Sequence, residues 1–343
     1  MELDLRRFKE ERDGTIRAEI TLTTTIGSVG RVAGPARLNL LSDRSIKQLA
    51  NTCKDVTDIP DWYALITHAA ATTVEYLRQG TPLELVDLDA PHERQWILNP
   101  FLEADGYTVL FARGGSGKSF LAAALALCIA TGNNLLGEVH KAGPVAYHDW
   151  EASKEEFDSR ISRLARAMQT PAPEVWYRKE TASLHHIAPT LNNHYAEHGV
   201  VAAIIDSKGM ALTGSPESAE AVLELTRSIR TLGVPIILID HVSKGAIKGD
   251  DPDMAFGSAY TEYGARLAWK LNPDWKTGSV DLRLKNTKAN NGPKADEQII
   301  TLTFDGDRVH VSTPQPPIPE PILGDRNILT ELAGLPDRRH FHP

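Results

Sequence analysis

The sequence lacks the features of several protein classes. Its 343 residues include only two cysteines, Cys53 and Cys128, which are far apart and have no metal-ligand spacing. We expect both to be plain buried thiols in a reducing compartment. The longest apolar run, FLAAALALCIA, has about half the length needed to span a bilayer. The amino-terminal stretch has no apolar signal core, so we expect a cytoplasmic protein with no membrane partner.

An excess of positive charge is missing as well. The chain has 37 lysine and arginine residues against 45 aspartate and glutamate residues, and its formal net charge is -8. Broad, nonspecific adhesion to nucleic acid needs a basic surface, so this balance argues against it. DNA bound by a few loops, such as loops at the centre of a ring, remains compatible with the composition.

Regions of different pattern follow one another along the chain, and the length suggests two or three structural units. Residues 1–92 mix short strand patterns with helical ones and carry no chemical motif, which predicts a small α+β unit. Its boundary falls in a turn-rich, acidic stretch at 80–95. Residues 93–313 alternate strand and helix patterns. Residues 314–343 form a tail that begins proline-rich and includes one short helical pattern.

The alternation after residue 96 predicts an α/β fold. The strand patterns are nearly continuous apolar runs, as expected of a mostly parallel sheet buried on both faces by helices. The expected strands are 107–112, 143–150, 200–206 and 234–240, and the expected helices are 117–131, 152–168, 184–198 and 216–232. The last patterns, 279–286 and 297–311, alternate polar and apolar residues and predict a β-hairpin or edge strands.

A glycine-rich segment, ARGGSGKS at 112–119, lies between an expected strand and an expected helix. Its glycines let the backbone curl so that successive N–H groups point at phosphate oxygens, and the following helix adds its positive amino-terminal end. Lys118 would neutralise the β- and γ-phosphates, and Ser119 would bind Mg²⁺. A glycine-rich turn matched by chance is the alternative, and the flanking strand and helix favour nucleotide binding.

We therefore expect ATP and Mg²⁺ as cofactors. Ala112 stands where the usual pattern opens with glycine, and this position tolerates alanine if its φ is negative. The expected nucleotide-binding residues run along the loop and into the helix: Arg113, Gly114, Gly115, Ser116, Gly117, Lys118, Ser119 and Phe120.

Two carboxylates are candidates for the chemistry. Asp206 ends an apolar strand and can orient water on Mg²⁺ together with Ser119, although a strand can also end in an ordinary aspartate. Ser207 follows it, where many P-loop ATPases keep their catalytic glutamate. The base must then lie elsewhere, and Glu151, at the carboxyl end of another strand, could accept a proton from the attacking water. The alternative is that Glu151 simply caps the next helix.

Other polar residues allow two interpretations each. His241 ends a strand and can contact the γ-phosphate and report its loss to the next loop, or it can be structural. The long loop at 243–258 fits a nucleic-acid contact or a solvated lid. Three lysines crowd a strand end and turn: Lys285, Lys288 and Lys294. They form a solvated hairpin tip, or one of them reaches a neighbouring subunit's ATP site to stabilise transition-state charge.

The order of these motifs resembles the RecA-like ATPase core. Within that class, VLFARGGSGKSFLAAALALCIATG, VAYHDWEASKEEFDSRISRLARA and IDHVSKG are similar to the RepA-like hexameric helicase ATPases of plasmids and phages, which have an AAA_25-type domain. Helicases of the DnaB type are more distant relatives. The resemblance covers about residues 93–313 and does not depend on the amino-terminal unit.

This resemblance implies a RecA fold, hydrolysis of ATP with Mg²⁺, and assembly into a homo-oligomeric ring, most often a hexamer. ATP then lies between subunits, and loops at the centre contact single-stranded DNA, with replication proteins as further partners. By motif position, Glu151 corresponds to the catalytic base, Asp206 to the magnesium-side acid and His241 to the γ-phosphate sensor. KANNGP is similar to the helicases' K-x-R-N-G-P segment, which places Lys288 at the trans-acting lysine and Asn290 where DnaB-type proteins have a finger arginine.

Three functions remain open on the sequence. The first is a DNA-stimulated ATPase motor, either a replicative helicase or a loader. The second is a RecA-like DNA-binding or regulatory switch that hydrolyses ATP slowly and does not unwind. The third is a small-molecule P-loop kinase, for which the sequence offers no arginine-rich lid.

Overall fold

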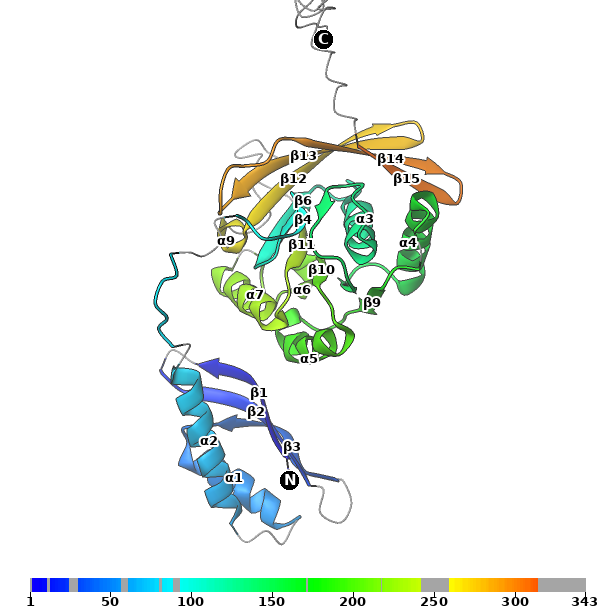
Figure 1. The fold of residues 1–343 in the computed structure, drawn as a ribbon. Helices are drawn as coiled ribbons and strands as arrows, with labels where there is room; N and C mark the ends of the chain where they lie inside the picture. The colour runs from blue at the N-terminus through cyan, green and yellow to red at the C-terminus, as the bar shows by residue number, and fades with distance from the viewer. Residues whose placement is uncertain are drawn as a thin grey trace, which may run out of the picture.

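The computed structural model describes residues 2–10, 13–24, 30–56, 61–79, 82–88, 93–170, 172–216, 218–241 and 259–313. These residues build a small three-stranded sheet with two helices and a nine-stranded sheet with helices on both faces (Figure 1). No helix in these ranges combines the length and the apolar character needed to cross a membrane.

The amino-terminal unit is an antiparallel sheet packed on two helices. Its elements are β1 (Glu2–Glu10), β2 (Ile16–Thr24), β3 (Gly30–Asn39), α1 (Asp43–Lys54) and α2 (Trp62–Gln79), with strand order β1-β2-β3. The hydroxyl of Ser42 accepts the Ser45 N–H and so caps α1. Apolar side chains of β2 and β3 meet those of both helices in one buried cluster that includes the thiol of Cys53.

The larger sheet combines a parallel part and an antiparallel part. The parallel strands are β6 (Tyr107–Ala112), β8 (Val145–Asp149), β9 (Val175–Lys179), β10 (Ala202–Asp206), β11 (Ile236–His241) and β12 (Leu267–Lys276). Antiparallel β13 (Ser279–Ala289), β14 (Gln298–Asp305) and β15 (Arg308–Ser312) continue beyond β12. The strand order is β15-β14-β13-β12-β6-β11-β10-β8-β9, so β6 lies near the centre.

Helices cover both faces of this sheet (Figure 1). The bounds of the helices are α3 (Lys118–Thr131), α4 (Lys154–Met168), α5 (Leu184–His198), α6 (Lys208–Ala211), α7 (Ala219–Leu232) and α9 (Ala259–Gly264). One apolar cluster unites α3 and α4 with the strands, and a second unites α5 and α7 with the opposite face. Because α3 is apolar on nearly every side, including Cys128, it lies buried between β6 and the curved antiparallel part. A separate small sheet consists of β4 (Trp96–Asn99), β5 (Leu102–Glu103) and β7 (Glu138–Val139), and apolar residues of β4 and β5 join the cluster around α3.

The predicted fold class is confirmed: the chain has a mostly parallel sheet flanked by helices and a small α+β unit. The helices expected at 117–131, 152–168, 184–198 and 216–232 are all present, with starts that differ by at most three residues. The alternative of a β-hairpin is confirmed by β14 and β15, which pair antiparallel across a tight turn. The alternative of edge strands holds only for β15, because β13 lies between β12 and β14, and β14 lies between β13 and β15. The tail at 314–343 and the loop at 243–258 lie outside the described residues.

Candidate nucleotide-binding site

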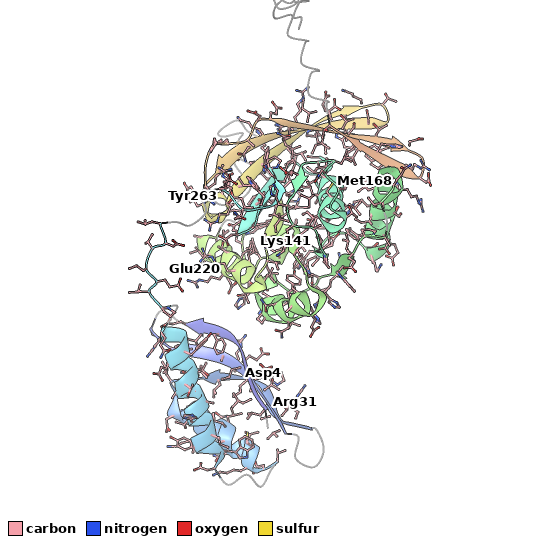
Figure 2. All side chains as sticks on the ribbon, in the orientation of Figure 1. Asp4, Arg31, Lys141, Met168, Glu220 and Tyr263 are labelled. Atoms are coloured by element: carbon pink, nitrogen blue, oxygen red, sulfur yellow. The ribbon has the colours of Figure 1, made fainter. Side chains whose placement is uncertain are left out.

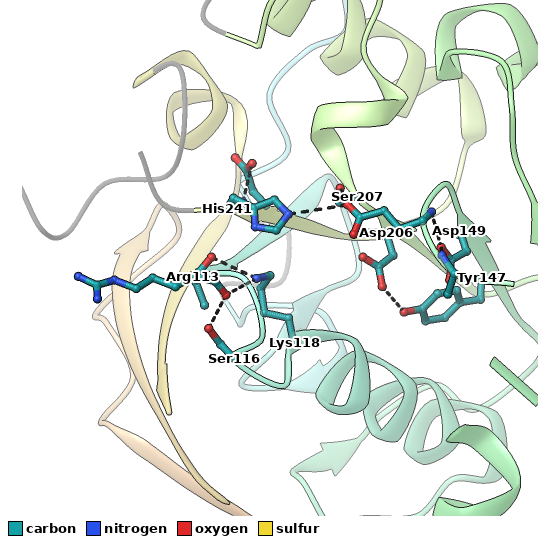
Figure 3. A network of polar contacts seen from close by, with 12 residues as sticks. Arg113, Ser116, Lys118, Tyr147, Asp149, Asp206, Ser207 and His241 are labelled. Atoms are coloured by element: carbon teal, nitrogen blue, oxygen red, sulfur yellow. Dashed lines mark hydrogen bonds and ion pairs between the residues drawn. The ribbon is translucent and has the colours of Figure 1, made fainter. Parts of the chain in front are cut away.

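The carboxyl ends of four parallel strands bring the predicted site residues together. Strand register pairs Ala112 with His241, and Asp149 with Asp206. Parallel strands end at the same edge of a sheet, and ligands of open α/β sheets bind outside that edge. The phosphate loop, which leaves β6 directly after Ala112, therefore faces the ends of β8, β10 and β11 (Figure 3).

The loop has the backbone conformation that a phosphate cradle needs. Gly115 has a φ of 71° and Gly117 a φ of 85°, a region that residues with a Cβ rarely adopt. Gly117 is also the N-cap of α3, so the free N–H groups of the first helical turn point toward the loop. A Cβ on Gly114 or Gly115 would meet nothing within 4 Å, which leaves open space beside the backbone. Among the described residues only Gln169 is a non-glycine with positive φ, so Ala112 meets the condition set by its sequence.

Lys118 is a buried cation held by neutral groups. Its ammonium donates to the carbonyl oxygens of Ala112 at 3.1 Å and Arg113 at 2.9 Å, and the residue is 6% exposed. Burial lowers the pKa of Lys118, and the nearby carboxylates of Asp206, Glu151 and Asp240 partly offset this effect. Both of these hydrogen bonds go to carbonyl oxygens and not to a carboxylate, so the positive charge of the Lys118 ammonium can attract a phosphate anion.

Asp206 and Ser119 supply the oxygen ligands that Mg²⁺ prefers. The Ser119 side chain forms a hydrogen bond with the Asp206 carboxylate, and the Tyr147 hydroxyl donates to Asp206 Oδ2 at 2.7 Å (Figure 3). Burial raises the pKa of Asp206 above its ordinary value, while both hydrogen bonds act in the opposite direction. A buried carboxylate beside a hydroxyl and a lysine fits a site completed by a divalent cation, whose charge would favour ionised Asp206.

Glu151 lies in the turn between β8 and α4, with half of its side chain exposed. Its Oε1 accepts a hydrogen bond from Ser207 Oγ at 2.5 Å and lies 3.8 Å from His241 Nε2. The alternative that Glu151 caps the next helix is wrong. Ser153 caps α4 through a reciprocal pair of hydrogen bonds with Glu156. The Glu151 carboxylate is thus free to face the phosphate loop and the end of β11.

Asp149 supports this turn and adds a second buried carboxylate. Its Oδ1 accepts the N–H groups of Glu151 at 2.8 Å and Ala152 at 2.7 Å. Its Oδ2 is buried and has no hydrogen-bond partner among the described residues. Burial and the charge of Asp206 raise the pKa of Asp149, although its hydrogen bonds lower it. Such an orphaned oxygen beside Asp206 fits a site that holds a hydrated cation.

Arg113 and Phe120, at the two ends of the expected binding segment, contribute through the backbone. The Arg113 carbonyl accepts from Lys118 and from Ser116, while its side chain points away from Lys118 (Figure 3). The Phe120 ring packs edge-on against Phe304 and lies under the guanidinium of Arg160, 5.3 Å from the ring centre. The side chains of both residues therefore lie outside the phosphate cradle.

Arg160 is a residue that the sequence motifs do not identify. Its Nε and Nη1 are buried and have no hydrogen-bond partner in the described part of the chain. Its positive charge lowers the pKa values of Asp206 and Tyr147, against the larger effect of their burial. A helical pattern such as SRISRLARA contains several arginines, and only the packing of α4 on α3 distinguishes Arg160.

A buried ion pair connects the end of β11 with two helices. The Lys208 ammonium donates to Asp240 Oδ2 at 2.5 Å and to Thr261 Oγ1 at 3.0 Å, and both charged side chains are almost fully buried. The other oxygen of Asp240 accepts the His241 N–H at 2.8 Å. The backbone of His241 is therefore tied to α6, which follows Asp206 and Ser207, and to α9.

Lys288 does not join the site of its own chain. Through β12 its register places it level with Val109, three residues before the phosphate loop begins. Its ammonium donates to the carbonyls of Glu262 and Tyr263, and burial lowers the pKa of Lys288. Asn290 next to it donates to the carbonyl of Ala265.

Comparison with known proteins is consistent with this geometry. The AAA_25 family model, described as an AAA domain, matches residues 71–246, just over half of the chain. The match starts inside α2 and includes the phosphate loop, Glu151, Asp206 and His241. A comparison with curated proteins gives no match. The chain belongs to the AAA_25 family, whose domains are of the P-loop ATPase type.

Proposed function

We propose that this protein is a RecA-like ATPase motor of the RepA type, a replicative DNA helicase or DNA-stimulated ATPase of phage or plasmid style that works as a hexameric ring. The observation that carries the proposal is the position of Glu151. It comes from β8 and meets Ser207 and His241 across the edge of the sheet, opposite Lys118. A base supplied by a neighbouring strand, with serine directly after the β10 aspartate, is the arrangement on which the RecA-like resemblance rests.

The residues divide the work of ATP hydrolysis among them. The loop N–H groups and Lys118 hold the β- and γ-phosphates of ATP. Mg²⁺, held by Ser119 and by Asp206 directly or through water, would neutralise charge that develops on the phosphate oxygens. Glu151 accepts a proton from the attacking water, and Ser207 keeps its carboxylate oriented. His241, the last residue of β11, has its Nε2 3.8 Å from Glu151 Oε1 and responds to the loss of the γ-phosphate.

The location of Lys288 supports a ring. Because Lys288 lies two strands from β6 and roughly 10 Å before the loop along the strand direction, it cannot assist its own site. A neighbouring copy is the partner for which such a lysine can stabilise transition-state charge. The DNA partner and the coupling of hydrolysis to unwinding follow from the family resemblance and stand as proposals.

The internal hydrogen bonds of Lys288 and Asn290 favour one alternative, a DNA-binding switch that hydrolyses slowly and does not unwind. Lys288 is held by the carbonyls at the end of α9, and Asn290 carries no charge. A ring with weak trans-activation would bind ATP and DNA while turning over slowly.

Turnover and mass in solution test the proposal together. We expect ATP hydrolysis that rises at least tenfold with single-stranded DNA, from a species of six chains. Lys118→Ala should abolish binding of a fluorescent ATP analogue, while Arg113→Ala, whose side chain points away, should bind nearly as well as wild type. A monomer without DNA stimulation would overturn the motor, and a DNA-stimulated hexamer that displaces no strand would favour the switch.

A further inference from the structure

The segment that joins the two parts of the chain exposes an unusual density of large apolar side chains. Residues 82–88, PLELVDL, are exposed throughout. Leu83 is 104% exposed, Leu85 99%, Val86 78% and Leu88 83%. Figure 2 shows this segment as a stretch of chain whose side chains project away from the backbone. A contiguous apolar stretch of this kind marks an interaction site.

The chemistry of this segment narrows what can cover it. In an extended chain, Leu83 and Leu85 point to one side, and Val86 and Leu88 to the other. The residues between and after them are acidic: Glu84, Asp87 and Asp89. Pro82 and Pro91 bracket the segment and favour an extended backbone. The segment therefore fits a strand that is covered on both faces and lies beside positive charge.

Strand β9 offers an edge with the complementary properties. It is the last strand of the nine-stranded sheet, and its outer side pairs with no strand in the described part of the chain. Arg178 and Lys179 are exposed on it, and Trp176 is 48% exposed and stacks on His198 of α5. Val175 and Tyr177 pack on the opposite face against the cluster formed with α4. A strand added beside β9 would thus have helices near both of its faces.

The other end of the same sheet fits less well. On β15, the exposed residues Arg308, His310 and Ser312 form a polar outer face, while Val309 and Val311 face the core. A strand added there would bury one apolar side and leave the other in water. Two-sided burial and charge complementarity therefore favour β9.

We propose that residues 83–88 of one chain add to the free edge of β9 in a second copy of this chain, with the acidic side chains beside Arg178 and Lys179. The inference rests on the ring of the proposed function and names the contact that would hold neighbouring subunits. Backbone hydrogen bonds to β9 supply affinity in this mode, and the leucines and the charges supply specificity. Subunits joined in this way exchange identical segments head to tail, which generates a ring when the rotation closes.

A peptide experiment tests this contact directly. The probe is a fluorescent peptide of residues 80–91, titrated into full-length protein that carries Leu85→Asp so that its own segment cannot compete. We expect saturable binding and slower deuterium uptake in residues 175–179, with neither effect for a scrambled peptide. Protection at β15 or at the amino-terminal sheet instead, or no binding at all, would overturn the proposal.

The second experiment measures the mass of variants in solution and the effect of exchanging charges between the segment and β9. Both measurements are made without nucleotide or DNA. Leu85→Asp should shift the full-length protein to smaller species, while Tyr76→Asp, at an exposed position on α2, should leave the mass unchanged. Lys179→Glu should weaken peptide binding at least tenfold, and a Glu84→Lys peptide should restore it. If the wild-type contact forms within one chain, Leu85→Asp will not change the mass and the inference fails.

These readouts separate the inference from the proposed function. The Lys118→Ala protein should bind the peptide as the wild-type site does, because β9 lies at the far edge of the sheet from β6. If the peptide binds at β9 and the wild-type protein does not hydrolyse ATP, the proposed contact is supported and the proposed ATPase motor is contradicted. If the protein hydrolyses ATP and does not bind the peptide, the ATPase is supported and the proposed contact is contradicted.

Discussion

The two parts of the chain bury different chemistry. In the amino-terminal unit, every buried side chain among the described residues is apolar or a thiol, from Ile16 to Val74. The nine-stranded part also buries charged groups, most of them at or just beyond strand ends: Lys118, Asp149, Asp206, Lys208, Glu180 and Asp240. Burying charge costs free energy, so this clustering is the mark of a site and not of a core.

The largest expected effect is the loss of ATP hydrolysis in a variant whose two parts both remain folded. Glu151→Gln should retain nucleotide binding and lower the rate of ATP hydrolysis by about 100- to 1,000-fold, because an amide cannot accept the proton from water. Steady-state turnover and binding of a fluorescent ATP analogue measure the two effects. Glu155→Gln, an exposed neighbour on α4, is the matched control. Unchanged turnover would show that Glu151 is not the base.

The buried ion pair tests whether charge in the larger part is costly. Asp240→Asn should lower the free energy of unfolding by about 3 kcal/mol, because it leaves the fully buried Lys208 ammonium without its carboxylate. Denaturant unfolding measures the loss. The exposed pair of Lys154 and Asp158 is the control, and Asp158→Asn should cost less than about 0.5 kcal/mol. A loss under about 1 kcal/mol for Asp240→Asn would contradict the assigned role.

The apolar core of the smaller unit should respond to a cavity and leave the site intact. Ile66 is 1% exposed, so Ile66→Ala should destabilise this unit by about 2–4 kcal/mol. Leu65→Ala, on the exposed side of the same helix, should have little effect. Thermal unfolding reports the loss, and the fluorescent ATP analogue reports the site. Equal loss of nucleotide binding would mean that the two parts depend on each other more than their separate clusters suggest.

The smallest effect concerns pH. Burial raises the pKa of Asp206 in the folded state, so the carboxylate favours folding while protonated, and this contribution is lost as pH rises through the folded pKa. Asp206→Asn should therefore be more stable than wild type at pH 7, and this advantage should shrink as the pH falls toward 4. Melting temperatures without Mg²⁺ between pH 4 and 7 measure it, with exposed Asp307→Asn as control. A constant difference across this range would contradict the cause.

Much of the parallel part was predictable because its strands are short apolar runs between periodic helices. Strands β1, β9 and β12 were not predicted. β9 is a five-residue edge strand with two cations, β1 is rich in charged residues, and β12 carries proline and aspartate where it continues past β6. Their pairing depends on neighbours that are distant in sequence, and local patterns do not contain that information.

The phosphate loop shows how far the sequence alone determines this protein. The glycines, Lys118 and Ser119 are consecutive, so their positions relative to one another follow from local backbone geometry. The family and the nucleotide site could therefore be inferred before the fold was known. Ser207, in place of a glutamate after Asp206, also let the sequence predict that Glu151 at the end of another strand is the base.

Only the tertiary structure decided how distant residues meet. Register between β8, β10 and β11 brings Glu151 to Ser207 and His241, and the packing of α4 on α3 places the guanidinium of Arg160 over the Phe120 ring. The tertiary structure also separates Lys288 from the phosphate loop of the same chain. It leaves residues 83–88 exposed and not paired with any strand that the structure describes. These facts depend on contacts between residues far apart in the chain, whose order in space is set by sheet pairing and by burial of the apolar helices, and not by spacing along the sequence.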